Sequence, residues 1–137
     1  MKTLIAEDDF VSRVLVQRSL DDYGPVVAVA NGQQAVEAFH EALRIEEPFD
    51  LVCLDIMMPE MDGMEALQKI RDLEQRFDIQ GLQRCKIMMI TALGDTKSVI
   101  EAFKSQCEGY LVKPFEREDL IAKLVEINAL PLGEMPS

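Results

Sequence analysis

The sequence predicts an α/β fold in which one five-stranded parallel sheet lies between two layers of helices, giving three layers in all. Five short apolar segments alternate along the chain with five longer segments of helical periodicity. Successive strand–helix units of this kind form a doubly wound parallel sheet with helices on both faces. The central apolar segments also lack a polar face, which is typical of strands that are covered on both sides.

The predicted strands are short runs rich in apolar and β-branched residues. They are expected at residues 3–6, 26–30, 51–54, 87–90 and 110–112. The last three runs each lead directly into a polar residue, which is Asp55, Thr91 or Lys113.

The predicted helices lie between the strands, where apolar residues recur at three- and four-residue spacing. They are expected at residues 10–21, 32–45, 64–77, a segment that begins near residue 95, and residues 116–128. In the first helix, the residues that share one apolar face are Val11, Val14 and Leu15. Asp95 is the expected cap of the fourth helix. The apolar residues of that helix are Val99, Ala102 and Phe103.

The length and composition are those of a single globular domain. The chain has 137 residues, of which 48% are hydrophobic and 28% charged. A chain of this size buries a sufficient core without disulfides or metal ions. We expect one domain over residues 1–128 and a short C-terminal tail over residues 129–137, which leaves no room for a second domain.

The charge balance argues against nucleic acid as a direct partner. The formal net charge is −11. Such a charge repels nucleic acid, whose binding rests on Lys and Arg side chains that neutralise phosphates. We therefore expect protein partners or bound cations.

The cysteines indicate a reducing compartment. Cys53, Cys85 and Cys107 form no CxxC pair, and their odd number fits no closed disulfide framework. The N-terminal residues do not have the pattern of a signal peptide, and no apolar stretch is long enough to span a bilayer. The sequence therefore predicts a cytoplasmic location without membrane insertion.

Polar residues collect at one end of the predicted strands. They are Glu7, Asp8 and Asp9 after the first strand, Asp55 after the third, Thr91 after the fourth and Lys113 after the fifth. In open parallel sheets the binding crevice lies beyond the carboxyl ends of the strands. These residues, distant in sequence, are therefore expected to meet at one edge of the sheet.

Such a cluster has a specific chemistry. Carboxylates gathered in one crevice repel each other by about 4 kcal/mol per pair at an effective dielectric of 20, unless a cation lies between them. Oxygen ligands without His or Cys suit Mg²⁺ better than Zn²⁺. Asp55 can then attack phosphorus as a nucleophile. Lys113 can supply positive charge, and the Thr91 hydroxyl a hydrogen bond, to the phosphoryl oxygens.

With these residues in place, the sequence resembles the receiver domains of response regulators in two-component systems, the family of the chemotaxis regulator, in a stand-alone form. The resemblance covers about residues 2–128. The matching motifs are residues 4–9 with Arg13, then residues 54–63, 90–92 and 110–115. The resemblance implies a flavodoxin-like fold with strand order 2-1-3-4-5 and five helices.

The resemblance also implies a role for each site residue. Asp55 is the phosphoacceptor, Asp8 binds Mg²⁺ (or Mn²⁺) directly, and Glu7 binds it through water. The backbone carbonyl of Met57 is the third protein ligand. Asp8 with Asp9 remains an alternative acidic pair.

The family's output route follows from the same resemblance. Phosphorylation draws the Thr91 hydroxyl inward, Tyr110 turns from exposed to buried, and Lys113 contacts the phosphate. The surface of the fourth helix, fifth strand and fifth helix then recruits a protein target, which the sequence does not identify. The phosphodonor is a sensor histidine kinase or a histidine phosphotransfer protein, and the chain is a monomer or a phosphorylation-dependent dimer. Pro114 is expected to follow a cis peptide bond.

Two apolar residues predict a long-lived phosphoryl group. Met57 and Leu93 lie two residues beyond Asp55 and Thr91, where family members often have polar residues that steer an attacking water. A phosphatase or phosphotransferase that uses an aspartyl phosphate commonly needs a second acid at the position of Met57. We therefore expect no enzyme activity beyond self-phosphorylation and self-dephosphorylation.

Two other functions fit the sequence less well. A flavin- or nucleotide-binding module would need a Ser-, Thr- or Gly-rich loop after the first strand, where this chain has acids. An interaction module that is never phosphorylated would not need the full set of acids, Thr91 and Lys113.

Overall fold

A computed structural model describes residues 1–92 and 106–136 of the chain. Its strands form one parallel sheet in the order β2-β1-β3-β4-β5. The strands are β1 (Thr3–Ala6), β2 (Val26–Val29), β3 (Leu51–Asp55), β4 (Lys86–Thr91) and β5 (Gly109–Val112). The predicted strands, their order and their parallel direction are therefore confirmed, with ends that differ by one residue at most.

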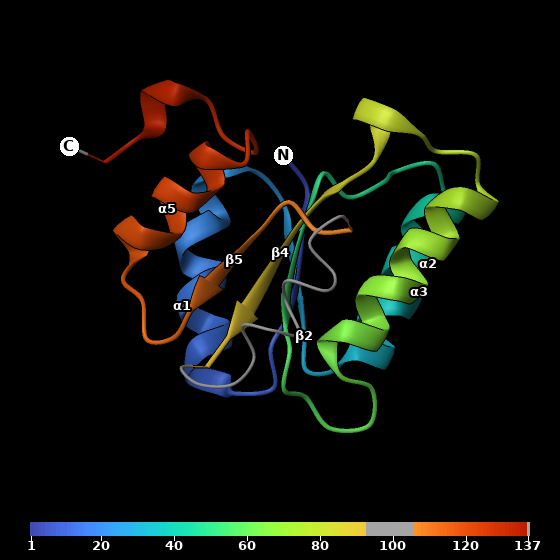
Figure 1. The fold of residues 1–137 in the computed structure, drawn as a ribbon, viewed down its shortest axis with the longest axis horizontal. Helices are drawn as coiled ribbons and strands as arrows, with labels where there is room; N and C mark the ends of the chain where they lie inside the picture. The colour runs from blue at the N-terminus through green and yellow to red at the C-terminus, as the bar shows by residue number, and fades with distance from the viewer. Residues whose placement is uncertain (93–105, 137) are drawn as a thin grey trace.

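Helices cover both faces of this sheet, so the predicted three layers are confirmed. They are α1 (Phe10–Leu20), α2 (Gly32–Arg44), α3 (Gly63–Arg76) and α5 (Arg117–Glu126). Figure 1 shows α1 and α5 on one side of the sheet and α2 and α3 on the other. The helix expected near Asp95, with Val99, Ala102 and Phe103, lies outside the described residues. Within the described ranges, no helix is long and apolar enough to cross a lipid bilayer.

The core has two parts, one on each face of the sheet. Alternate residues of β3 point into them: Val52 and Leu54 join the cluster under α2 and α3, while Leu51 and Cys53 join the cluster under α1 and α5. All of β3 is buried. The uniformly apolar sequence of its first four residues, 51–54, therefore reflects packing on both faces.

The apolar face expected in the first helix is not the buried one. Val11 is 73% exposed and Leu15 41% exposed, whereas the buried residues of α1 are Val16, Ser19 and Leu20. Ser19 is accommodated because its hydroxyl donates a hydrogen bond to the Leu15 carbonyl. Apolar residues occur all around this helix, so their spacing alone could not select the face that packs on the sheet.

The C-terminal tail folds back onto the domain. Asn128 adopts a left-handed backbone conformation just beyond α5, and the Ala129 amide donates to the Leu124 carbonyl. Leu130 is buried in the cluster under α1 and α5. A short 3-10 helix, Leu132–Glu134, then lies near α5 (Figure 1).

Candidate functional site

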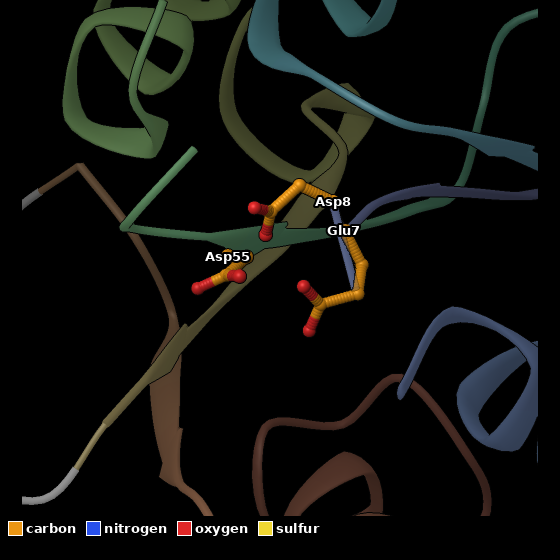
Figure 2. Close-up of side chains that lie close together, drawn as sticks. All are labelled: Glu7, Asp8 and Asp55. Carbon is orange, nitrogen blue, oxygen red and sulfur yellow. The ribbon is translucent and has the colours of Figure 1, made fainter. Parts of the chain in front are cut away.

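Three carboxylates meet at the carboxyl end of the sheet. Glu7 and Asp8 follow β1, and Asp55 is the last residue of the neighbouring strand β3, whose Leu54 pairs with Ala6. Figure 2 shows the three side chains close together, and one carboxylate oxygen from each lies within 4.8 Å of the others. Glu7 and Asp55 are buried, whereas Asp8 is exposed.

Lys113 brings a positive charge to the same place from the end of β5. Its Nζ lies 2.5 Å from Glu7 Oε1 and 3.3 Å from Asp55 Oδ2. The backbone amide of Lys113 donates to the Thr91 carbonyl at 2.7 Å, which fixes the lysine to the end of β4. The Lys113–Pro114 peptide bond is cis, as predicted.

The electrostatics of the cluster favour an additional cation. Burial raises the pKa of Glu7, and the neighbouring Asp55 raises it further, although Lys113 opposes both. Partial burial alone would lower the pKa of Lys113, but pairing with Glu7 and Asp55 raises it overall. Three carboxylates face one ammonium group. A divalent ion would balance the remaining two negative charges, and an oxygen-only donor set fits Mg²⁺.

Asp9 has a structural role at the start of α1 and is not part of the cluster formed by Glu7, Asp8 and Asp55. Its carboxylate accepts a hydrogen bond from the Ser12 amide at 2.9 Å and so caps α1. That hydrogen bond lowers the pKa of Asp9. The Asp9 amide in turn donates to Glu7 Oε2 at 3.1 Å, and Arg13 donates to the Glu7 carbonyl at 2.9 Å. The geometry therefore favours Glu7 and Asp8 as the acidic pair. Asp is a common residue directly before a helix, and this preference is the signal that could have identified Asp9 as the cap of α1.

The loop between β3 and α3 is held close to Asp55. The Met57 amide donates to Asp55 Oδ1 at 3.3 Å, and the Gly63 amide donates to the Ile56 carbonyl at 2.9 Å. A Cβ atom at Gly63 would lie 2.3 Å from the Asp55 carbonyl oxygen, so only glycine fits there. The start of α3 is fixed by Asp62, whose carboxylate accepts from the Glu65 amide.

The two predicted switch residues lie on adjacent strands. Thr91 is buried at the end of β4, where its hydroxyl donates to the Ala92 carbonyl at 3.2 Å. Tyr110, on β5, pairs with Met89 and is partly buried against the cluster under α2 and α3. Leu93 lies outside the described residues.

Apolar side chains remain exposed around this end of the molecule, a feature that sequence reasoning missed. Phe10 is 67% exposed and Val11 73% exposed at the start of α1, directly after the acidic residues. Met57, two residues beyond Asp55, is 67% exposed. Helical spacing could not reveal this exposure, because it does not tell which face of α1 meets the sheet.

Known proteins match most of the chain. A family model described as a response regulator receiver domain matches residues 3–125. "Probable transcriptional regulator ycf29" of Porphyra purpurea is 37% identical over 120 residues, which is 87% of this chain and 52% of that protein. "Chemotaxis protein CheY" of Listeria monocytogenes is 32% identical over 126 residues, which is 90% of this chain and 95% of that protein. The chain thus spans about half of the first relative and nearly all of the second.

A solved structure has the same fold. It is the receiver domain of the histidine kinase CKI1 from Arabidopsis thaliana, complexed with Mg²⁺ and BeF₃⁻. The TM-score is 0.76 and the sequence identity 24%, over 94% of this chain and 90% of that one.

Proposed function

Because the chain belongs to the response regulator receiver domain family, we propose that Asp55 accepts a phosphoryl group and thereby switches the binding of a protein partner. Receiver domains are generally phosphoacceptor switches and not classical enzymes. The observation that carries the proposal is the meeting of Asp55 with Glu7, Asp8 and Lys113 at one end of the sheet.

The proposed donor is a phosphohistidine of a sensor histidine kinase or a histidine phosphotransfer protein. A carboxylate oxygen of Asp55 attacks phosphorus, and the phosphorus–nitrogen bond breaks with its electron pair leaving on the imidazole. Lys113, already directed at Asp55, neutralises charge on the transferred group, and the Thr91 hydroxyl donates to one of its oxygens. The new P–O bond gives an acyl phosphate on Asp55.

Receiver domains bind Mg²⁺ at an acidic pocket, and the cluster here has the donor set for it. In this chain the metal would be held by Glu7, Asp8, Asp55 and the backbone carbonyl of Met57, with Mn²⁺ as a substitute. When bound, the ion supplies positive charge that stabilises the phosphoryl oxygens in transfer. Because Glu7 and Asp8 would share the metal, its binding would not depend on the carboxylate of Asp55 alone.

The metal assignment is tested by calorimetric titration of the protein with MgCl₂. We expect Glu7→Gln and Asp8→Asn to weaken Mg²⁺ binding at least about tenfold, because each removes a negative charge from the cluster. Asp9→Ala is the matched control, since Asp9 caps α1, and it should leave Mg²⁺ affinity within about threefold. Loss of binding in Asp9→Ala alone would transfer the role to the alternative acidic pair.

The phosphoacceptor role is tested by intact mass after treatment with acetyl phosphate. With Mg²⁺ we expect a gain of about 80 Da, one phosphoryl group. The gain should be absent with EDTA and absent in Asp55→Ala. A gain that persists in Asp55→Ala would refute the assignment.

The exposed apolar start of α1 supports a protein as the natural donor. Phe10 and Val11 lie beside the acidic cluster in sequence and are mostly exposed, and surfaces of this kind often bind proteins. Val11→Asp should therefore slow transfer from a phosphorylated histidine protein. Labelling by acetyl phosphate, which needs no docking surface, should keep its rate.

For the output, we propose that Thr91 and Tyr110 transmit phosphorylation to β5, α5 and the expected fourth helix. Two observations support this route: β4 pairs with β5, and the Lys113 amide donates a hydrogen bond to the Thr91 carbonyl. We propose that the target is a downstream protein and that the chain acts in the cytoplasm. The same proposal takes residues 1–128 as the domain, followed by a short tail, and the protein as a monomer or a phosphorylation-dependent dimer. Tyr110→Ala should abolish phosphorylation-dependent partner binding while Asp55 is still labelled.

The phosphoryl group is proposed to be long-lived. The Met57 side chain is apolar and offers no hydrogen bond that would orient a water for attack on phosphorus. Met57→Asn should therefore shorten the lifetime of the phosphorylated protein about tenfold, measured by phosphate release, because the amide can orient the attacking water by a hydrogen bond. Hydrolysis of the unmodified protein within seconds would contradict the proposal.

A further inference from the structure

A hollow of about 520 Å³ lies on the face formed by β5 and α5, and the C-terminal tail reaches its edge. Val112, Pro114 and Phe115 form its wall on the β5 side, and Ala122 lies on the α5 side. Met135, from the tail, also lines the hollow, together with Leu111 and the charged residues Asp119, Lys123 and Glu126. A segment distant in sequence therefore contributes an apolar side chain to this face.

The tail is held at two points before it reaches the hollow. Leu130 is 7% exposed and packs in the cluster under α1 and α5. Farther along, the Tyr23 hydroxyl donates to Glu134 Oε2 at 3.2 Å, which ties the tail to the turn after α1. These contacts direct residues 130–136 back along α5 (Figure 1).

The wall of the hollow is directly linked to the acidic cluster. Lys113, whose Nζ contacts Glu7 and Asp55, is followed in sequence by Pro114 and Phe115. Pro114 restricts the backbone between the lysine and the wall. A displacement of Lys113 would therefore act on Pro114 and Phe115, which line the same hollow as Met135.

We propose that residues 130–136 form a strap over the β5–α5 hollow, released when Asp55 is phosphorylated; this rests on the function proposed above. A phosphoryl group adds roughly two negative charges, so Lys113 leaves the Glu7 carboxylate to pair with it. Pro114 and Phe115 move with Lys113, and the wall no longer matches the tail. Met135 is 44% exposed at the edge of the hollow, so little buried area is lost when it leaves.

The strap opposes phosphorylation by the same coupling. If phosphorylation weakens tail binding, tail binding must disfavour phosphorylation by an equal free energy. The strap also occupies part of the face through which the proposed output acts. Its release therefore makes Phe115 and Ala122, which are half-buried in the present structure, more accessible to a partner after the signal arrives.

The test observes the methionine methyl groups by NMR in protein labelled with [methyl-¹³C]methionine. Met135→Leu and Met57→Leu assign two of the eight methionine signals. On addition of Mg²⁺ and beryllium fluoride, a phosphoryl mimic, the Met57 signal should shift because it lies next to the site. The Met135 signal should shift toward its position in unfolded peptide and become narrower, and neither should change in Asp55→Ala.

The outcomes separate the two proposals. A shift of Met57 with an unchanged Met135 signal overturns the strap and leaves the phosphoacceptor role standing. No change in either signal means that the mimic does not bind, which overturns both.

An equilibrium titration with beryllium fluoride in the presence of Mg²⁺ tests the coupling independently. Deletion of residues 131–137 should tighten binding of the mimic about twofold or more, at unchanged Mg²⁺ affinity. Tyr23→Phe removes the hydrogen bond to Glu134 and should act in the same direction, so the result does not depend on the folding of the deletion variant. Leu132→Ser, at a tail residue that is 78% exposed, is the matched control and should keep the original affinity. Equal affinities in all four proteins would contradict the strap.

Discussion

The ammonium group of Lys113 lies 2.5 Å from the Glu7 carboxylate, so the end of β5 is joined electrostatically to the end of β1 across the two strands between them. Lys113 therefore neutralises part of the cluster that is proposed to bind Mg²⁺. A bound metal ion would compete with Lys113 for the same negative charge, and phosphorylation of Asp55 would give Lys113 a new anionic partner.

We expect Lys113→Met to bind Mg²⁺ more tightly, about tenfold, because a competing positive charge is removed from beside Glu7 and Asp55. The same variant should be labelled by acetyl phosphate much more slowly, since the transferred group loses its cation. Titration calorimetry and intact mass measure the two effects. Lys69→Met, an exposed lysine on α3, is the control that should change neither. Weaker Mg²⁺ binding in Lys113→Met would contradict the competition.

Gly63→Ala should destabilise the protein by about 1–3 kcal/mol, because the added methyl group would lie 2.3 Å from the Asp55 carbonyl oxygen and force the backbone apart. Displacement of Asp55 should also slow its labelling. Urea unfolding measures the free energy. At Gly133 an added Cβ meets no atom within 4 Å, so Gly133→Ala should unfold like the unmodified protein. Equal stability of the two variants would mean that Gly63 does not face Asp55 as described.

Arg71→Met should cost about 3 kcal/mol of the free energy of unfolding, because it removes the buried cation and leaves Glu74 with the more distant Arg84, whose Nε lies 3.7 Å away. Arg71 Nη1 lies 2.6 Å from Glu74 Oε1, and Nη2 lies 3.0 Å from Glu108 Oε2. The matched control is Arg44→Met, which breaks an exposed ion pair on α2 and should leave stability unchanged within error. A small effect of Arg71→Met in urea unfolding would show that the ion pairs of Arg71 with Glu74 and Glu108 contribute little to stability in solution.

The stability of the protein should fall at alkaline pH. Burial raises the pKa of the Cys53 thiol to about 12, from 9.0 in an exposed thiol. Between these values the unfolded chain loses the proton and the folded chain keeps it, so the free energy of unfolding decreases as pH rises. One thiol contributes up to about 1.4 kcal/mol per pH unit. Cys53→Ala should therefore show a shallower decline of the free energy of unfolding between about pH 9 and about pH 11, roughly the range over which this linkage acts. Urea unfolding at each pH measures the decline. Parallel declines would contradict a buried thiol.

The sheet and the meeting of Glu7, Asp55 and Lys113 could be predicted because both follow from short-range pattern and topology. Apolar runs locate parallel strands, and all carboxyl ends of such strands lie at one edge. A polar residue at a strand end is therefore placed in space once its strand is recognised. Neither step needs knowledge of side-chain packing.

Other features depend on packing between distant segments and were not predictable. Arg71 lies on an amphipathic helix, where a charged residue indicates a solvated face, yet it is buried because residues 106–108 bring a carbonyl and a carboxylate to it. The exposed face of α1 was unpredictable for the same reason. Apolar residues occur all around that helix, and its packing against the sheet determines that Val16 and Leu20 are buried. The return of the tail to α5 likewise has no local signal.

The central claim is that the carboxylate of Asp55 becomes an acyl phosphate, and chemical mapping tests it most directly. Borohydride reduces an aspartyl phosphate to homoserine, so protein treated with acetyl phosphate and Mg²⁺ is reduced, digested and sequenced by mass spectrometry. We expect homoserine at position 55 and at no other aspartate. Homoserine at Asp8 or Asp9 with Asp55 intact, or its absence from a folded, Mg²⁺-loaded protein, would contradict it.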